Sequence, residues 1–443
     1  MTEQIEIKPN FKARAHPLIL LELNELNFEW VEQYSLKGEL PEFRRLLSDY
    51  KICKTTSEVE YEKCEPWIQW VSAHSGKTFA EHGIFRLGDI VDSGVEQIWK
   101  TLEKRNISVG AISPMNVEND LKNPAFFIPD PWTDTPVSGS RLAKALCEGI
   151  KQIVNANAGG KVGLQSYVKL ASGAVRYARL RNLAAYLSMS LGSVGRPWRK
   201  ALFLDRLLAD LFISEQKRHT PEFSTLFLNA GAHVQHHYLF NSKIYKGARS
   251  NPSWYVKDGD DPVLEAYKCY DQIIGDVRCA FPGARLMILT GLHQDPYAET
   301  SFYWRLHDHA KFLREVGVPF SSVEPRMSRD FLLWTDSEAE ATQTEQALRE
   351  ARLGESGVPV FTTDNRGKSL FITLTWPEDV PADMPLKVNG RKINNFRDSL
   401  AFVAIKNGHH NPVGYIVDTK TTSGAEQFPI EKVHTRILEH FEG

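Results

Sequence analysis

The sequence has few cysteines, no long apolar run and almost no net charge. Its five cysteines in 443 residues are widely spaced, which argues against a disulfide framework and against a zinc knuckle. A formal net charge of −2 gives no electrostatic reason to expect nucleic acid or an acidic membrane surface as a partner. The first residues lack the apolar run of a signal peptide, and no segment is apolar for long enough to span a bilayer. We therefore expect a cytoplasmic protein without a transmembrane segment.

Short apolar runs alternate with segments of helical periodicity, in a chain too long for one simple core. The apolar runs predict buried parallel strands, and the periodic segments predict helices between them. The strands are expected at 16–23, 223–229 and 284–290, and the helices include 28–36, 66–75, 262–278 and 304–316. This alternation predicts an α/β fold built on a mainly parallel sheet.

Two regions differ from the rest of the chain in composition and in predicted secondary structure. Residues 141–217 are basic and helical throughout, which predicts a helical insertion or cap. Residues 328–398 combine short strands with one helix, which predicts a small α+β subdomain. The α/β core would then consist of 1–140, 218–327 and 399–443.

Polar residues follow several of the predicted strands. Because ligands of open α/β sheets bind at the carboxyl ends of the strands, Glu22, Asn24 and Glu25 stand where a site is expected. Histidines follow the later strands, and imidazole together with carboxylate suits Zn, Mn or Fe. The candidate ligands of such a metal are Glu22, Asn24, His233, His236, His293 and His410. For each single histidine, a hydrogen-bonded structural role is the alternative.

The helix predicted at 66–75 begins at Pro66 and stops at Gly76, with Glu65 at its N-cap. The positive end of a helix dipole lowers the pKa of a nearby thiol, so Cys64 is a candidate nucleophile. Glu65 is a second candidate, as nucleophile, base or metal ligand. The alternatives are simple capping by Glu65 and a buried apolar role for Cys64.

The order of these motifs resembles the alkaline phosphatase superfamily, especially its type I phosphodiesterase/nucleotide pyrophosphatase branch. The resemblance covers 17–296 and 399–416. It runs through Leu20–Glu25, Gly38–Pro41, Cys64–Pro66, Ser75-Gly76, Phe79–Ile84, Asn229–His233, Thr290–His293 and His410–Gly414. It implies an alkaline-phosphatase-like sheet with helices on both faces, and a metal-dependent enzyme.

The chain departs from that pattern at the residues that matter most for chemistry. Asn24, Asn229 and Gly291 stand at or beside three aspartate places, and the usual Thr or Ser nucleophile is missing. Fewer carboxylates hold less positive charge, so we expect one divalent ion at most. The expected function is a hydrolase or transferase acting on a small phosphate or sulfate ester. The alternatives are a binding or scaffold protein that has lost catalysis, and metal-free acid–base chemistry by the histidines.

Overall fold

An eight-stranded sheet organises the computed structural model, which describes residues 16–156, 164–326, 329–421 and 426–442. The strand order is β17-β2-β16-β6-β1-β5-β3-β4, and only β16 runs against the other seven. The strands are β1 (Leu18–Leu23), β2 (Ile52–Thr56), β3 (Val109–Ile112), β4 (Phe126–Ile128), β5 (Phe223–Leu228), β6 (Arg285–Leu289), β16 (Val413–Asp418) and β17 (Gln427–Pro429). The prediction of a mainly parallel α/β sheet is confirmed.

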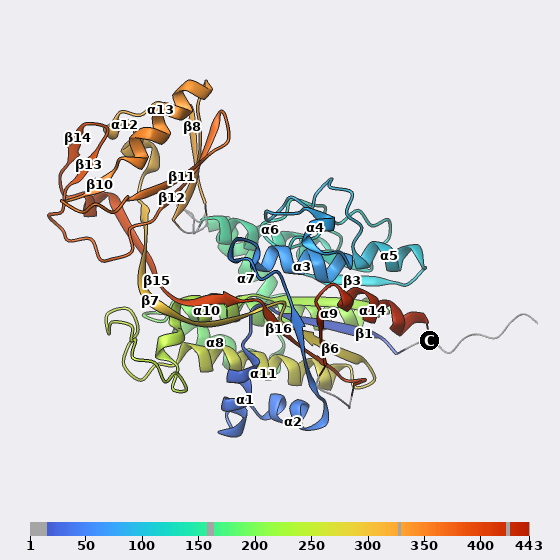
Figure 1. Cartoon of the computed structure of the whole chain (residues 1–443). Coiled ribbons are helices and arrows are strands. Elements are labelled where there is room, and N and C mark those ends of the chain that lie inside the picture. Colours follow the sequence, from blue (N-terminus) through green and yellow to red (C-terminus); the bar gives the residue numbers. More distant parts are fainter. Residues whose placement is uncertain (1–15, 157–163, 327–328, 422–425, 443) are drawn as a thin grey trace, which may run out of the picture.

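Helices cover both faces of this sheet (Figure 1). Side chains of β1 alternate between the two faces, as in any strand. Leu18 and Leu20 pack toward one set of helices, whereas Ile19, Leu21 and Leu23 pack toward the other. The first set is α3 (Pro66–Ser75), α5 (Ile98–Lys104) and α14 (Lys432–Glu442). The second set includes α1 (Phe28–Leu36), α2 (Pro41–Asp49), α9 (Trp198–His219) and α11 (Pro262–Ala280).

A two-stranded ribbon leaves the carboxyl edge of the sheet and leads into a separate group of elements (Figure 1). The ribbon pairs β7 (His293–Leu306) with β15 (Leu400–Asn411). The group has a hydrophobic core of its own, which runs from Trp304 to Leu400. It contains α12 (His309–Val316), α13 (Glu338–Arg349), β8 (Ser322–Pro325), β9 (Asp330–Trp334), β10 (Arg352–Leu353), β11 (Phe361–Asn365), β12 (Ser369–Leu374), β13 (Leu386–Val388) and β14 (Arg391–Ile393).

One secondary-structure prediction in this region is wrong. The expected helix over 304–316 is a strand up to Leu306, and α12 begins only at His309. The reason is tertiary pairing, since Trp304 and Leu306 face Phe402 and Leu400 on β15. Asp308 then caps α12 by accepting a hydrogen bond from the Lys311 backbone N–H at 2.9 Å.

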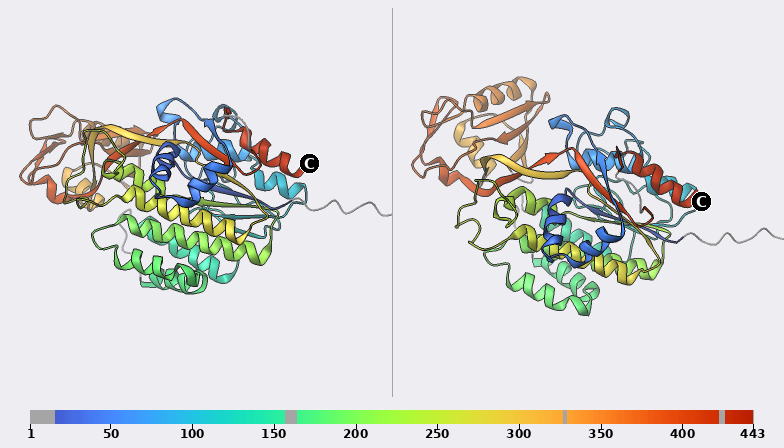
Figure 2. Two further views of the ribbon diagram at one scale, coloured as in Figure 1. Left: turned by 90° about the horizontal axis from the view of Figure 1, so that it is seen from below. Right: turned by 60° about the horizontal axis from the view of Figure 1, so that its bottom comes forward.

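In the basic region 141–217, of which residues 157–163 lie outside the described parts, the structure has α6 (Arg141–Ala156), α7 (Leu164–Tyr177), α8 (Leu183–Leu191) and most of α9. Helices α6, α7 and α8 form an outer layer on the side of the sheet that α9 and α11 cover (Figure 2). Two short helices complete the fold near the sheet edge, α4 (Phe79–His82) and α10 (Ala230–Tyr238). Within the described ranges, no helix combines the length and the apolar character that crossing a membrane requires.

Candidate functional site

The candidate site lies at the carboxyl edge of the sheet, where β1 ends. Glu25 follows β1 in a left-handed backbone conformation, with φ of 60°, that few residues other than glycine adopt. Its side chain is buried, with 2% of the residue exposed. Asn24 Nδ2 donates to Glu25 Oε1 at 3.0 Å, and Gln294 Nε2 donates to Oε2 at 2.5 Å. Two amides therefore fix the position of this carboxylate.

Two histidines from distant parts of the chain meet the same carboxylate oxygen. His236 of α10 and His410 of β15 each place Nε2 at 3.1 Å from Glu25 Oε2. The two Nε2 atoms lie 3.3 Å from each other. We call Glu25, His236 and His410 the triad, and its three candidate ligand atoms lie within 4.8 Å of one another.

The triad is strongly coupled by charge. Burial alone would raise the pKa of Glu25, but His410 and His236 outweigh burial and hold that pKa well below its usual range. Burial likewise opposes the charged form of His410, yet Glu25 outweighs it and raises the pKa of His410 to about 9. The structure therefore favours a carboxylate in contact with a positively charged ring.

Glu65 lies beside the triad at the N-cap of α3. Its Oε2 is 3.5 Å from Nδ1 of His410, on the side of the ring that faces away from Glu25. Burial raises the pKa of Glu65 to about 7, with His410 opposing the rise. Burial also raises the pKa of the Cys64 thiol, to about 12, so this thiol stays protonated at neutral pH. Of the two predicted catalytic residues, Glu65 contacts the triad through its side chain, whereas Cys64 contacts it only through its backbone carbonyl, which accepts a hydrogen bond from His410.

Glu22 and Asn24 point toward α3. Glu22 Oε1 lies 2.6 Å from His74 Nε2, and both side chains are fully buried. Asn24 accepts a hydrogen bond from Trp70 Nε1 at 2.7 Å and donates to Asn229 Oδ1 at 2.8 Å. Glu22 thus lies in a buried pair below α3, whereas Asn24 supports the triad through Glu25.

The other two histidines predicted as ligands lie outside the triad. His233 shares α10 with His236 but is exposed, with its ring 5.0 Å from that of His237. His293 Nδ1 donates to the Val413 carbonyl at 2.5 Å, and its Nε2 is 3.3 Å from Asp295. Of the predicted ligand set, only His236 and His410 converge on one point.

Glu25 and Gln294 are site residues that were not among the ligand and catalytic candidates predicted from the sequence. Glu25 stands in the polar run after the first predicted strand, so its position was visible in the sequence. Its left-handed backbone, which redirects the side chain, was not visible. Gln294 lies beyond the end of the strand predicted at 284–290, and in the structure it belongs to β7, opposite His410.

The donor set of the triad fits a divalent transition metal. Two imidazole nitrogens and one carboxylate oxygen are the three protein ligands of many catalytic zinc sites, which leave one position open. Ligand atoms bound tetrahedrally to zinc at about 2.0–2.1 Å lie roughly 3.3 Å apart. The three separations within the triad, 3.1, 3.1 and 3.3 Å, agree with that spacing.

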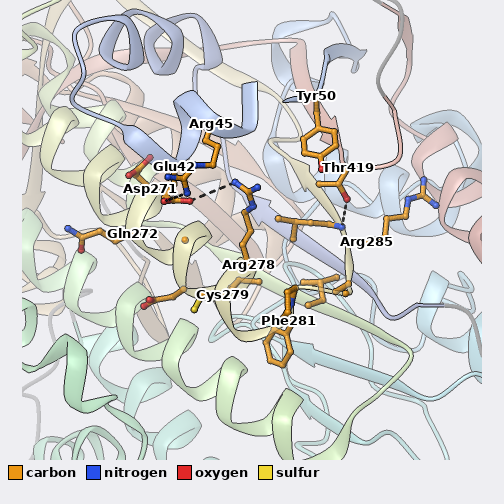
Figure 3. Close-up of a pocket in the computed structure, with 18 of the residues that line it drawn as sticks. Glu42, Arg45, Tyr50, Asp271, Gln272, Arg278, Cys279, Phe281, Arg285 and Thr419 are labelled. Carbon is orange, nitrogen blue, oxygen red and sulfur yellow. Dashed lines mark hydrogen bonds and ion pairs between the residues drawn. The ribbon is translucent and has the colours of Figure 1, made fainter. Parts of the chain in front are cut away.

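A cavity lies at the opposite end of the sheet (Figure 3). It has a volume of about 1410 Å³ and is lined by Ile19, Arg285 and Leu286 at the amino ends of β1 and β6. Its guanidinium groups are engaged by acids, as Arg285 is by Asp418 at 2.6 Å and Arg278 by Glu42 at 3.7 Å. Because its lining residues come from the amino ends of the strands, the cavity is separate from the triad at their carboxyl ends.

Comparisons with known proteins place the chain beside two groups of solved structures. No protein-family model and no curated protein sequence matches it. Phosphonoacetate hydrolase from Sinorhizobium meliloti 1021, in complex with phosphonoacetate, is 12% identical, with 96% of each chain covered and a TM-score of 0.44. Human ectonucleotide pyrophosphatase/phosphodiesterase 5 is 10% identical, with 96% of this chain and 95% of that chain covered, at a TM-score of 0.44.

The murine form of the second protein gives 9% identity and a TM-score of 0.42 over the same shares of the chains. The fold follows from the sheet topology, and the candidate site follows from the geometry of the triad.

Proposed function

We propose that the protein is a metal-dependent hydrolase or transferase acting on a small phosphate or sulfate ester, with one divalent ion held by Glu25, His236 and His410. The observation that carries this proposal is the convergence of three ligand atoms on one point at the carboxyl edge of the sheet. Zn, Mn or Fe suits this nitrogen-rich donor set. When bound, the ion supplies Lewis-acid polarisation of an ester oxygen and compensates its negative charge.

The surrounding residues have distinct tasks in this proposal. Asn24 and Gln294 hold the Glu25 carboxylate in place, which is the role that hydrogen-bond partners of metal ligands have. The N-terminus of α3 offers the positive end of the helix dipole to an anionic ester. Its first residue, Pro66, has no N–H, and the Ile68 and Gln69 N–H groups donate to the Glu65 carbonyl. Glu65 stands at that same helix end, where it can take or give a proton during ester cleavage. The candidate base is thus Glu65, because Cys64 is a buried, protonated thiol.

Metal analysis combined with matched histidine variants tests the proposal. Protein stripped with EDTA and reloaded with Zn²⁺, Mn²⁺ or Fe²⁺ is expected to hold about one ion per chain, measured by mass spectrometry of the metals. Turnover of aryl phosphate, phosphodiester and sulfate substrates should follow that loading.

His236→Ala and His410→Ala are expected to lose both the ion and turnover. His233→Ala is the control, because this exposed histidine lies on the same helix but outside the triad. If metal-free wild-type protein turned over the substrates in the presence of EDTA as well as the metal-loaded protein does, a metal-dependent reaction would be contradicted. Equal losses in all three variants would contradict the assignment of the ligands.

One observation favours a second candidate, a binding or scaffold protein that keeps the fold without catalysis. The Asn24 and Asn229 side chains bond to each other at 2.8 Å, and amides replace carboxylates at places where the resemblance expects aspartates. In addition, Glu25 already has both histidines as partners. A protein that binds the ion stoichiometrically but turns over none of the three ester classes with any of the metals would support this candidate over the enzyme.

A further inference from the structure

An unusual concentration of exposed apolar side chains marks the outer helices α7 and α8. Of the twelve large hydrophobic residues exposed in the described parts of the chain, seven lie between 168 and 194. They are Val168, Val175, Leu180, Leu183, Leu187, Leu191 and Val194, with exposures from 46% to 88%. Exposed apolar residues gathered in this way usually mark an interaction surface.

These residues follow the helical repeat. Leu183, Leu187 and Leu191 are four residues apart on α8, so they share one face of that helix. Val168 and Val175 are seven apart and share one face of α7. The opposite faces are anchored to the protein, since Tyr186 of α8 donates to Asp210 of α9 at 2.9 Å. The apolar side chains therefore point outward because the inward faces are already packed.

Charge in this segment has a single sign. Residues 149–204 contain nine Lys and Arg and no Asp or Glu, in a chain whose net charge is −2. Six of the eight cations in the described part of this segment pair with acids of neighbouring segments, as Arg196 does with Asp260 and Arg199 with Glu265. Arg176 and Lys200, before and after α8, are exposed and have no ion pair among the described residues. No carboxylate of the segment itself opposes an approaching anionic surface.

From these features we propose that α7 and α8 dock this protein on an anionic lipid surface. The leucines of α8 would enter the boundary between headgroups and acyl chains, while the flanking cations contact lipid phosphates. A second copy of the chain fits less well, because the unpaired charges of this face, Arg176 and Lys200, are both positive and would face the same two cations of the other copy. The outer position of these helices leaves them open to a flat surface (Figure 2).

Vesicle binding tests this proposal with variants of exposed residues. The full-length protein should co-sediment with vesicles of equal parts phosphatidylglycerol and phosphatidylcholine, and only weakly with phosphatidylcholine alone. The double variant Leu187→Asp/Leu191→Asp should lose binding on the order of ten-fold. Arg176→Glu/Lys200→Glu should lose roughly five-fold or more, with a weaker dependence on salt. Leu36→Asp is the control, because Leu36 is 82% exposed on a different helix. This variant should bind vesicles like the wild type.

Two further measurements separate the alternatives. A fluorophore on Leu187→Cys, in a Cys279→Ser background that removes the exposed native thiol, should shift to the blue with vesicles. Light scattering should show the same mass for the wild type and for Leu187→Asp/Leu191→Asp. Absence of vesicle binding, or equal binding by this variant, overturns the proposal. A dimer that the variant dissociates also overturns it, and would assign the face to a second copy of the chain.

Discussion

At the scale of single residues, two glutamates three positions apart have different surroundings. Glu25 contacts both histidines of the triad, whereas Glu22 forms a fully buried pair with His74 of α3. Glu25→Gln keeps the shape and the left-handed backbone but removes the charge, so metal affinity should fall by roughly 100-fold or more. Titration of the stripped protein with Zn²⁺, followed calorimetrically, measures this loss.

The matched variant is Glu22→Gln. It weakens a buried pair and should lower the free energy of unfolding by about 1–3 kcal/mol, with zinc affinity unchanged. If Glu22→Gln lost the metal and Glu25→Gln kept it, the ligand predicted from the sequence would be the correct one.

At the scale of elements, α3 depends on the glycine that ends it. Gly76 has a φ of 69°, and a Cβ added there would lie 3.0–3.1 Å from the ring of His434. Gly83 ends α4 with a φ of 65°, but a Cβ there would meet nothing within 4 Å. Gly83→Ala should cost only the left-handed backbone energy, about 1 kcal/mol. Gly76→Ala should cost more because of the added clash, as measured by urea denaturation; equal losses would show that His434 yields freely.

The helix that carries His236 is held at its start by a buried acid. Asp205 accepts hydrogen bonds from the Ala230 backbone N–H and the Tyr270 hydroxyl, both at 2.7 Å. Burial raises the pKa of Asp205 to about 6, against 3.8 for an ordinary aspartate, although these hydrogen bonds oppose the rise. The folded protein therefore keeps a proton that the unfolded chain has already released between these two pH values. The contribution of Asp205 to stability is greatest below the lower value and declines until the higher one.

Asp205→Asn should remove this pH dependence. The unfolding free energy of the variant, relative to the wild type, should rise between pH 4 and 7 by at most about 3 kcal/mol. Asp260→Asn is the control. Its hydrogen bond from Arg196 lowers the pKa of Asp260, so its contribution is lost only at more acidic pH and the difference should stay flat. A flat difference for Asp205→Asn as well would show that Asp205 titrates normally.

The sequence revealed elements better than side-chain directions, for physical reasons. The apolar runs of β1, β5 and β6 have no other stable place than a buried sheet, and Pro66 and Gly76 mark both ends of α3. The extent of β7 depends on β15, a partner about 100 residues away, so local periodicity misassigned it. The triad likewise depends on the left-handed turn at Glu25, which the packing of the surrounding chain imposes.

At the scale of the whole molecule, the β7–β15 ribbon joins the hydrophobic core of the 304–400 group to the cores on the two faces of the main sheet. Phe361 and Leu348 belong to the core that runs from Trp304 to Leu400, and Leu211 belongs to the core under the main sheet. Cores that share few contacts open independently, so damage to one should stay local. The triad belongs to the main sheet, although His410 lies on the ribbon that leads into the second core.

This division predicts the effect of a cavity in each core. Phe361→Ala and Leu211→Ala each remove a buried side chain and should destabilise their own core by about 2–5 kcal/mol. In hydrogen exchange followed by mass spectrometry, Phe361→Ala should speed exchange in 304–400 and leave α9 and β5 unchanged. Leu211→Ala should do the reverse. Because His410 is anchored by Glu25 at the sheet edge, Phe361→Ala should also keep its metal. Faster exchange along the whole chain in both variants would instead show that the ribbon couples the two cores into one cooperative unit.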